Sequence, residues 1–187
     1  MLPDIRNFFW RPKLALQIFH FVFLGFISFS CRQNESTEAM RVFPEYGVWM
    51  DSLLLSKEKI VRGVEPGSDV SEILLTEKRP VTEQDSSSVY FEFAVDSVTA
   101  ASVNYQISSN IIQEIEISIT STDQEKTSVM LSDLEKYFTL RFGPPVSEKG
   151  IAVFSAVNSV GDNIKISLED ISSTNQGKIS VLVYSEK

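Results

Sequence analysis

The side chains that come closest to a catalytic arrangement are two neighbouring carboxylates. Glu114 and Glu116 lie two residues apart in EIEISI, residues 114–119, where isoleucine alternates with other residues, so a strand would point both at one face of a sheet. A pair of carboxylates can divide acid and base roles, as in glycoside hydrolysis. Such a pair can also keep the wet face of a sheet soluble or attract a basic partner. The spacing leaves these three roles open.

Other catalytic groups are scarce. The single histidine, His20, lies in an apolar segment near the N-terminus, and the single cysteine is Cys31. The chain after Cys31 therefore lacks the groups for Ser-His-Asp or Cys-His chemistry and the commonest zinc ligands. The glycines are scattered singly, and Gly161-Asp162-Asn163 fits a hairpin turn better than a cation loop. The sequence predicts no enzyme activity, no cofactor and no metal site.

The first 30 residues have the layout of a secretory signal. Arg6, Arg11 and Lys13 precede residues 14–29, sixteen residues without a charged side chain at neutral pH. A membrane-spanning helix needs about 20 apolar residues, and this run is shorter and is interrupted by polar side chains. We therefore predict a signal peptide over residues 1–30.

The end of this run resembles the lipobox of bacterial lipoproteins. In that family a small residue precedes a cysteine that is acylated and becomes the first residue after cleavage. Ser30-Cys31 fits this pattern, whereas Ser28 and Phe29 depart from it. The alternative is a buried free thiol, but the polar sequence RQNESTE that follows offers nothing to bury it. The resemblance implies that lipid on Cys31 anchors the protein to a membrane of the cell envelope. Arg32 after the cysteine indicates the outer membrane, by the sorting habit of enteric lipoproteins.

Cleavage before Cys31 would leave 157 residues, which is the size of one domain. This part holds 14 Lys and Arg against 24 Asp and Glu, a net charge of −10. That charge opposes binding to the phosphates of nucleic acids. A partner chosen by its charge should be basic.

Two short segments precede the patterned part of the chain. Residues 31–42 are polar and aperiodic, which predicts a tether; the 11 residues after Cys31 can span at most about 36 to 40 Å. Residues 43–62, the lead-in segment, contain Tyr46 and Trp49. These aromatic side chains are candidate anchors of a binding interface, or they clamp the segment onto the core.

After Gly63 the chain shows similar phrases twice, in the same order. The five pairs are SDV 68–70 and SDL 132–134, PVTE 80–83 and PVSE 145–148, AVDSV 94–98 and AVNSV 156–160, SSN 108–110 and STN 173–175, and IEISI 115–119 and ISVLV 179–183. Their offsets of 62 to 65 residues indicate a tandem duplication, with repeat one at 63–120 and repeat two at 128–185.

Each repeat predicts one helix followed by three strands. Ser68 would cap the first helix, with Val70, Ile73 and Leu74 on its apolar side. The second helix would carry Met130, Leu134 and Phe138 on one stripe and would stop at Gly143. Strands are predicted from two-residue alternation around residues 90–95, 103–107, 114–119, 164–169 and 179–184.

Together these patterns predict an α+β domain over residues 63–187. Clean alternation favours an antiparallel sheet with one wet face, and two amphipathic helices can cover the other. We expect a tandem duplication of an α-β-β-β unit, with about six strands and with helices on one face.

This element order, with the phrases GVEPGSDVSEIL and LEKYFTLRFGPPV, resembles the beta-lactamase-inhibitor-like proteins, the BamE (SmpA) assembly lipoproteins and the PepSY modules. The resemblance covers residues 63–187 and implies a fold and a style of function. Members of these groups mostly bind other proteins, some through the open face of the sheet.

The predicted function is therefore a lipid-anchored, non-catalytic protein-binding or assembly module of the cell envelope. The alternatives are a carrier of a small apolar ligand and a carboxylate-dependent envelope hydrolase. Polar side chains of the predicted strands form the candidate partner-binding face, although Lys165 partly offsets its negative charge. They are Glu92, Asn104, Gln106, Glu114, Glu116 and Glu169.

Overall fold

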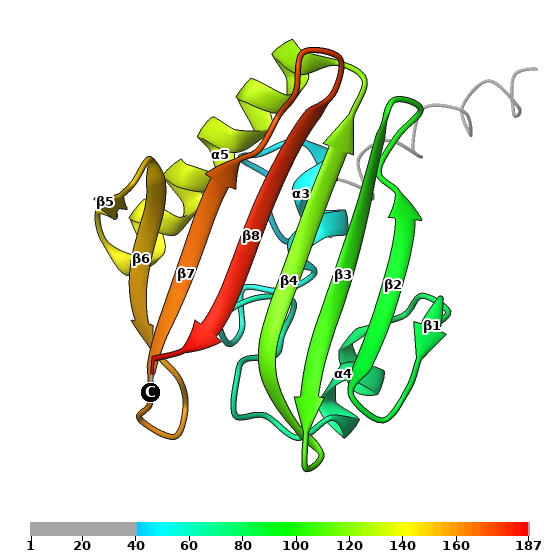
Figure 1. Cartoon of the computed structure of the whole chain (residues 1–187), viewed down its shortest axis with the longest axis vertical. Helices are drawn as coiled ribbons and strands as arrows, with labels where there is room; N and C mark the ends of the chain where they lie inside the picture. Colours follow the sequence, from blue (N-terminus) through cyan, green and yellow to red (C-terminus); the bar gives the residue numbers. More distant parts are fainter. Residues whose placement is uncertain (1–40, 187) are drawn as a thin grey trace, which may run out of the picture. The chain divides into compact units, whose positions relative to one another are not determined.

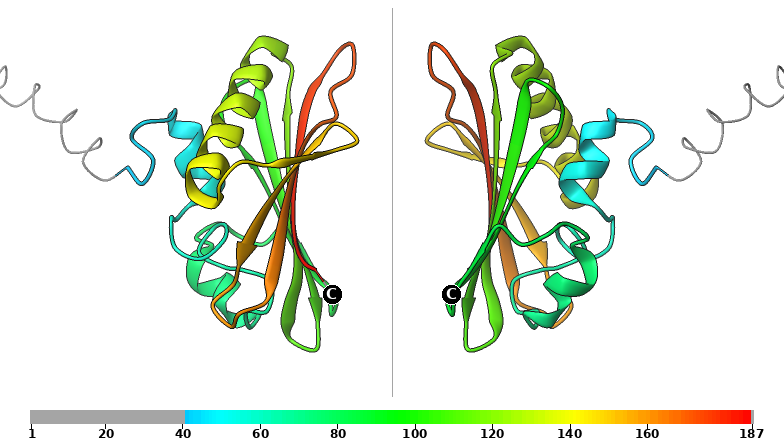
Figure 2. Two further views of the ribbon diagram at one scale, coloured as in Figure 1. Left: turned by 90° about the vertical axis from the view of Figure 1, so that its left-hand side faces the viewer. Right: turned by 90° about the vertical axis from the view of Figure 1, so that its right-hand side faces the viewer.

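An antiparallel sheet of eight strands organises the computed structural model, which describes residues 41–186 (Figure 1). The strand order is β1-β2-β3-β4-β8-β7-β6-β5. The strands are β1 (Glu83–Gln84), β2 (Ser88–Ala94), β3 (Thr99–Ser108), β4 (Ile111–Ser121), β5 (Val146–Glu148), β6 (Ile151–Val157), β7 (Asn163–Asp170) and β8 (Gly177–Ser185). Helices cover one face of this open sheet and leave the other uncovered (Figure 2). The predicted signal peptide and Cys31 lie outside the described residues.

The core lies between the helices and the covered face of the sheet. Every second side chain of the central strands is buried there, as the alternation predicted. At the middle of the sheet Ile117 of β4 faces Val181 of β8, and both are fully buried. The sequence therefore correctly predicted an antiparallel α+β layer with one wet face.

The strand count differs from the six that the sequence predicted. The two additional strands, β1 and β5, have two and three residues and lie at opposite edges of the sheet. Their side chains are exposed, so neither leaves a buried alternation in the sequence. Short edge strands also limit pairing with other chains.

A tight turn joins β3 to β4, and a bulge that the sequence did not predict lies next to it. Ser109 and Asn110 both have positive φ, as two-residue hairpin turns require. The register shifts between Gln106 and Ile107, which leaves Gln113 of β4 without an opposite residue. This irregularity lies beside the predicted binding residues of both strands.

Helix α5 (Gln124–Phe142) is the main cover of the sheet. The Asp123 side chain caps its N-terminus, and Gly143 ends it. Met130, Leu134 and Phe138 are buried, as predicted. Phe138 packs on Phe154 of β6, with ring centroids 5.5 Å apart.

Helix α4 (Ser71–Thr76) is shorter than predicted and begins later. Ser68 does not cap it, because the Ser68 hydroxyl accepts a hydrogen bond from Lys59 and its carbonyl accepts one from the Ile112 N–H. Ile73 is buried, but Leu74 is exposed. A helix of six residues makes fewer than two turns, so only one of its apolar side chains reaches the core. The prediction that Leu74 lies on the apolar side was therefore wrong.

The lead-in segment packs on the helical side of the sheet. It contains helix α3 (Val48–Leu54), whose Met50, Leu53 and Leu54 are buried. Arg141 of α5 donates hydrogen bonds to the backbone carbonyls of Lys59 and Ile60. No helix among the described residues is long and apolar enough to cross a bilayer.

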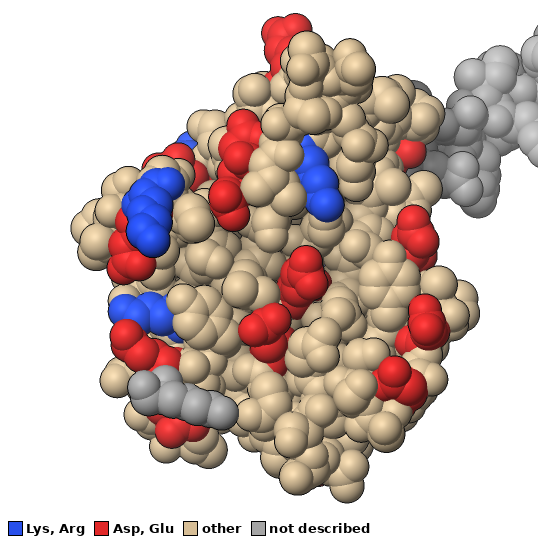
Figure 3. Space-filling view, in the orientation of Figure 1, with Lys and Arg blue, Asp and Glu red and all other residues tan. Residues whose placement is uncertain are grey.

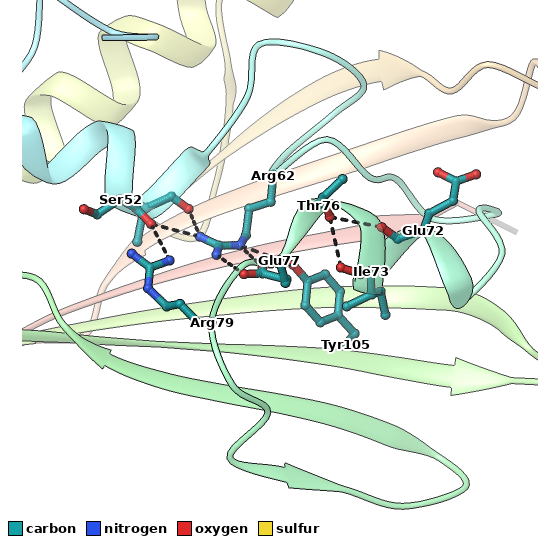
Figure 4. Close-up of polar contacts among 9 residues, drawn as sticks. Ser52, Arg62, Glu72, Ile73, Thr76, Glu77, Arg79 and Tyr105 are labelled. Carbon is teal, nitrogen blue, oxygen red and sulfur yellow. Dashed lines mark hydrogen bonds and ion pairs between the residues drawn. The ribbon is translucent and has the colours of Figure 1, made fainter. Parts of the chain in front are cut away.

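A buried ion pair joins the lead-in segment to the sheet (Figure 4). Arg62 is fully buried and donates two hydrogen bonds to Glu77, at 2.6 and 2.7 Å. The Tyr105 hydroxyl donates to the same carboxylate at 2.6 Å, and burial raises the pKa of Tyr105. Arg62 also donates to the carbonyls of Ser52 and Leu53 in α3. The network therefore connects α3, the end of α4 and β3.

Candidate binding surface on the open sheet face

The open face is built from the side chains that alternate with the buried rows. Because neighbouring strands keep their register, side chains opposite one another stand on the same face. All six residues predicted for the binding face point to this side, as the burial pattern of their strands shows.

Four of the six come together at the middle of the face. Asn104 of β3 lies opposite Glu116 of β4, and Gln106 lies opposite Glu114. On the other side of β4, strand β8 places Leu182 opposite Glu116 and Tyr184 opposite Glu114. We call these six side chains the central block: Asn104, Gln106, Glu114, Glu116, Leu182 and Tyr184.

The other two predicted residues lie outside the central block. Glu92 is on β2, opposite Ser102, and Glu169 is on β7, opposite Ser180. Strand β3 separates Glu92 from β4, and strand β8 separates Glu169 from it. They contribute negative charge on either side of the central block without joining it.

The two carboxylates of the central block are electrostatically uncompensated. Among residues 41–186, neither Glu114 nor Glu116 has a hydrogen bond or an ion pair through its carboxylate. Partial burial raises the pKa of Glu114, and the charge of Glu116 raises it further. Figure 3, which looks onto this face, shows acidic side chains near its middle surrounded by uncharged ones.

The nearest base along the row is already engaged. Lys165 of β7 lies opposite Tyr184, so β8 separates it from Glu114. Its ammonium group donates to the Ser155 hydroxyl and pairs with Glu186 at 3.5 Å. The predicted offset of negative charge by Lys165 therefore acts mainly at the β7 side.

The aromatic and aliphatic members of the block were not predicted. Leu182 and Tyr184 belong to a strand whose buried residues, at 179, 181 and 183, show the alternation. The same alternation places 182 and 184 on the opposite face, so the signal was present in the sequence. Tyr90 of β2 joins the same row, opposite Asn104.

A cleft of about 540 Å³ adjoins the central block where β4 and β8 separate. The last residue pair between these strands is Glu114 with Tyr184, and the cleft begins beyond it. Its lining residues are Gly67, Ile111, Ile112, Gln113, Gly161, Asp162, Asn163, Ser185 and Glu186. The cleft thus lies at the end of the sheet, one residue from Glu114 along β4, and is bordered by the β6–β7 turn and the segment before α4.

The two candidate aromatic anchors lie far from this face, in the helical layer. Tyr46 is only 7% exposed and makes an edge contact with Tyr137 of α5, with centroids 6.2 Å apart. Trp49 is partly buried against the core. Both side chains therefore hold α3 and its preceding turn against the domain, which is the structural alternative considered from the sequence.

The space between helix and sheet is closely packed where α5 crosses β8. A Cβ atom at Gly177 would lie 2.0 Å from the Thr127 hydroxyl oxygen, so these backbones approach as closely as glycine allows. This packing does not favour the carrier alternative at that place. Within residues 41–186, no group of three or more His, Cys, Asp or Glu side chains is arranged to hold a metal ion.

Comparisons of the chain with protein families, with curated proteins and with solved structures gave no match. The resemblance to the beta-lactamase-inhibitor-like, BamE and PepSY groups therefore stays a prediction. The geometry of the open face is the basis for a functional proposal.

Proposed function

We propose that this protein is a lipid-anchored, non-catalytic module of the cell envelope that binds another protein through the open face of its sheet. The observation that carries the proposal is the central block. It places two uncompensated carboxylates between amide side chains on β3 and a tyrosine and a leucine on β8. Aromatic side chains such as Tyr184 are enriched in protein interfaces, and uncompensated carboxylates beside one select a partner of opposite charge.

The partner should present Lys or Arg side chains. A basic side chain above Glu114 and Glu116 would find two carboxylates without a competing cation and the ring of Tyr184 beside them. Such complementarity raises association rates and excludes acidic partners. Asn104 and Gln106 can hydrogen-bond the partner's polar groups.

Photo-crosslinking in intact cells of the native host tests this face. A benzophenone amino acid at Ser118, next to Glu116 on β4, should give a discrete protein adduct, and the same probe at Ser132 on α5 should not. Adding Glu114→Lys and Glu116→Lys to the Ser118 probe should abolish that adduct, because the charge reversal would repel a basic partner.

The matched control carries the same change in charge on the helical side and the β5 edge. Glu135→Lys and Glu148→Lys alter exposed side chains of α5 and β5 and should leave the Ser118 adduct intact. The proposal fails if the Ser118 adduct survives the Glu114 and Glu116 reversal in a folded protein. Equal loss in the control would mean that net charge, rather than this face, determines capture.

The lipid anchor has its own test. We infer that Cys31 is acylated, so the Cys31→Ser variant should leave the membrane fraction and the mass of the native protein should show an acylated Cys31 at its N-terminus. Full retention of the variant in the membrane would instead assign anchoring to residues 14–29.

We also propose that the domain arose by tandem duplication. The element order helix-then-four-strands occurs twice, and β4 meets β8 at the centre with Ile117 opposite Val181, which are 64 residues apart. Each half of the domain also contacts the other through the turn between its second and third strands. Asp96, in the β2–β3 turn, pairs with Lys126 at the start of α5, and Asn158, in the β6–β7 turn, bonds the Pro66 carbonyl before α4. Diverged relatives whose halves show no such offset would contradict this origin.

A further inference from the structure

We propose that the helical layer of this domain faces and touches the lipid bilayer, so that the open sheet face points away from the membrane. By the helical layer we mean residues 41–79 and α5. The inference rests on the proposed lipid anchor, and it adds an orientation and a second interaction surface, whose partner is the lipid surface.

The sheet-bearing unit begins in the helical layer. Phe43, the second residue of the sheet-bearing unit, is fully buried and contacts Tyr137 of α5 with ring centroids 5.4 Å apart. The first residues of this unit therefore lie in the helical layer, on the side opposite the open face (Figure 2). The 11 residues from Arg32 to Val42 span at most about 40 Å, so the anchor keeps this entry point within that distance of the bilayer.

Exposed aliphatic side chains lie on that side, in α3 and α4, and others lie in β5, β6 and the β6–β7 turn, at Val146, Val157 and Val160. Val48 of α3 is 69% exposed, and Leu74 and Leu75 of α4 are 65% and 80% exposed. Two residues along a helix turn the side chain by about 200°, so Val48 lies opposite the buried Met50 and Leu75 opposite the buried Ile73. Val48 and Leu75 thus point away from the sheet.

Charge is distributed unevenly between the helical layer and the sheet. The helical layer, residues 41–79 and 124–142, holds nine Lys and Arg against ten Asp and Glu. The sheet and its turns, residues 80–123 and 143–186, hold three against twelve. Anionic headgroups repel an acidic surface and tolerate a nearly neutral one. The strongly acidic sheet should therefore be the side that stays away from the bilayer.

These three observations agree on one orientation. Partial insertion of a few aliphatic side chains adds little to the membrane affinity of an acyl anchor and would not hold the domain on the bilayer alone. It is sufficient to select which side of an anchored domain faces the bilayer. The central block would then be presented to the aqueous space beyond the domain. A partner would reach it without competing with lipid.

Fluorescence quenching by lipids tests the orientation with the full chain purified from host membranes. Acylation occupies Cys31, the only native cysteine, so an introduced cysteine is the single free thiol. Val48→Cys, Leu75→Cys and, on the open face, Gln106→Cys would each be labelled with an environment-sensitive dye. The labelled proteins would be placed in phosphatidylethanolamine–phosphatidylglycerol vesicles that carry a headgroup nitroxide.

We expect quenching at residues 48 and 75 to exceed that at residue 106 by about threefold or more, since interfacial side chains lie within the headgroup region. Equal quenching at the three sites, or stronger quenching at residue 106, would overturn the orientation even though the protein floats with the vesicles. Failure to float would instead contradict the lipid anchor, and the orientation would fall with it. Circular dichroism of each labelled variant verifies its fold.

Discussion

Replacing Glu77 by glutamine should cost this domain a large part of its stability. The substitution keeps the size of the side chain and an oxygen that can accept from Tyr105, but it removes the negative charge that faces Arg62. Arg62 is 0% exposed, so its guanidinium would remain charged with only neutral oxygens, including the carbonyls of Ser52 and Leu53. Breaking a buried pair in this way costs about 3 to 5 kcal/mol.

The structure also predicts an order among the variants. Arg79 donates to the Ser52 carbonyl at 3.3 Å and stacks on Phe93, close to the same network. After Glu77→Gln, Arg62 and Arg79 would repel each other without a carboxylate between them. After Arg62→Met, Glu77 would keep the hydrogen bond from Tyr105 and the attraction of Arg79. This variant should therefore lose less stability than Glu77→Gln.

Urea unfolding at pH 7 measures these free energies. For a domain of this size, a loss of about 3 to 5 kcal/mol should also lower Tm by about 9 to 15 °C. The exposed pair of Lys57 with Glu45 is the control, since Lys57→Met should cost no more than about 1 kcal/mol. The double variant Arg62→Met with Glu77→Met should recover much of the loss, because it leaves no unpaired buried charge. A cost for Glu77→Gln no larger than that for Lys57→Met would refute the reasoning.

Two further predictions concern the packed core. Burial raises the pKa of Tyr105, so the folded protein keeps a proton that the unfolded chain releases near pH 10, and stability should fall as pH rises above about 10. The free energy of unfolding of Tyr105→Phe, measured in urea between pH 9 and 11, should fall less steeply with pH than that of the unaltered protein. Parallel curves for the two proteins would contradict this assignment. Gly177→Ala should cost about 1 to 3 kcal/mol by forcing α5 away from β8, whereas an unchanged unfolding midpoint would show that the helix shifts freely.

The sequence predicted the elements that have a long, regular hydrophobic period. Strands β3, β4 and β8 and helix α5 each bury several residues at the spacing of one element, so their type and inner face follow from pattern alone. For the same reason, the outward direction of Glu114 and Glu116 could be predicted.

What the sequence could not predict depends on single contacts between distant segments. Arg62 looks like a surface residue until Glu77 and Tyr105 are brought to it by the fold. Ser68 looks like a helix cap, but Ile112, 44 residues away, takes its carbonyl. The bulge at Gln113 is marked in the sequence only by a three-residue step between the buried Ile112 and Ile115, and its cause is the pairing with β3. The grouping of the central block likewise could not be predicted without the register of β4 against β8.

Glu114 lies where its charge disfavours the fold, and this placement distinguishes a binding role from a solubilising one. Charges that only keep a sheet soluble are best set beside opposite charges, as Lys165 is beside Glu186. Glu114 instead has its pKa raised by partial burial and by Glu116, so the folded state favours its neutral form. The free-energy cost of the Glu114 charge is absent below the carboxyl pKa of the unfolded chain. This cost grows as the pH rises above that value and is complete above the higher pKa of the folded state.

It follows that Glu116→Gln should stabilise the domain at pH 7 and should stabilise it less at pH 4, because the raised pKa of Glu114 reduces its charge in the fold as the pH falls. The same substitution should weaken the crosslink from Ser118, because it removes half of the charge offered to a basic partner. Urea midpoints at the two pH values, read beside the crosslink, separate the explanations. If Glu116→Gln is less stable and keeps its adduct, the carboxylate pair serves the fold itself. If the variant is more stable and its adduct is weaker, the pair reduces stability in favour of binding, as expected of a functional site.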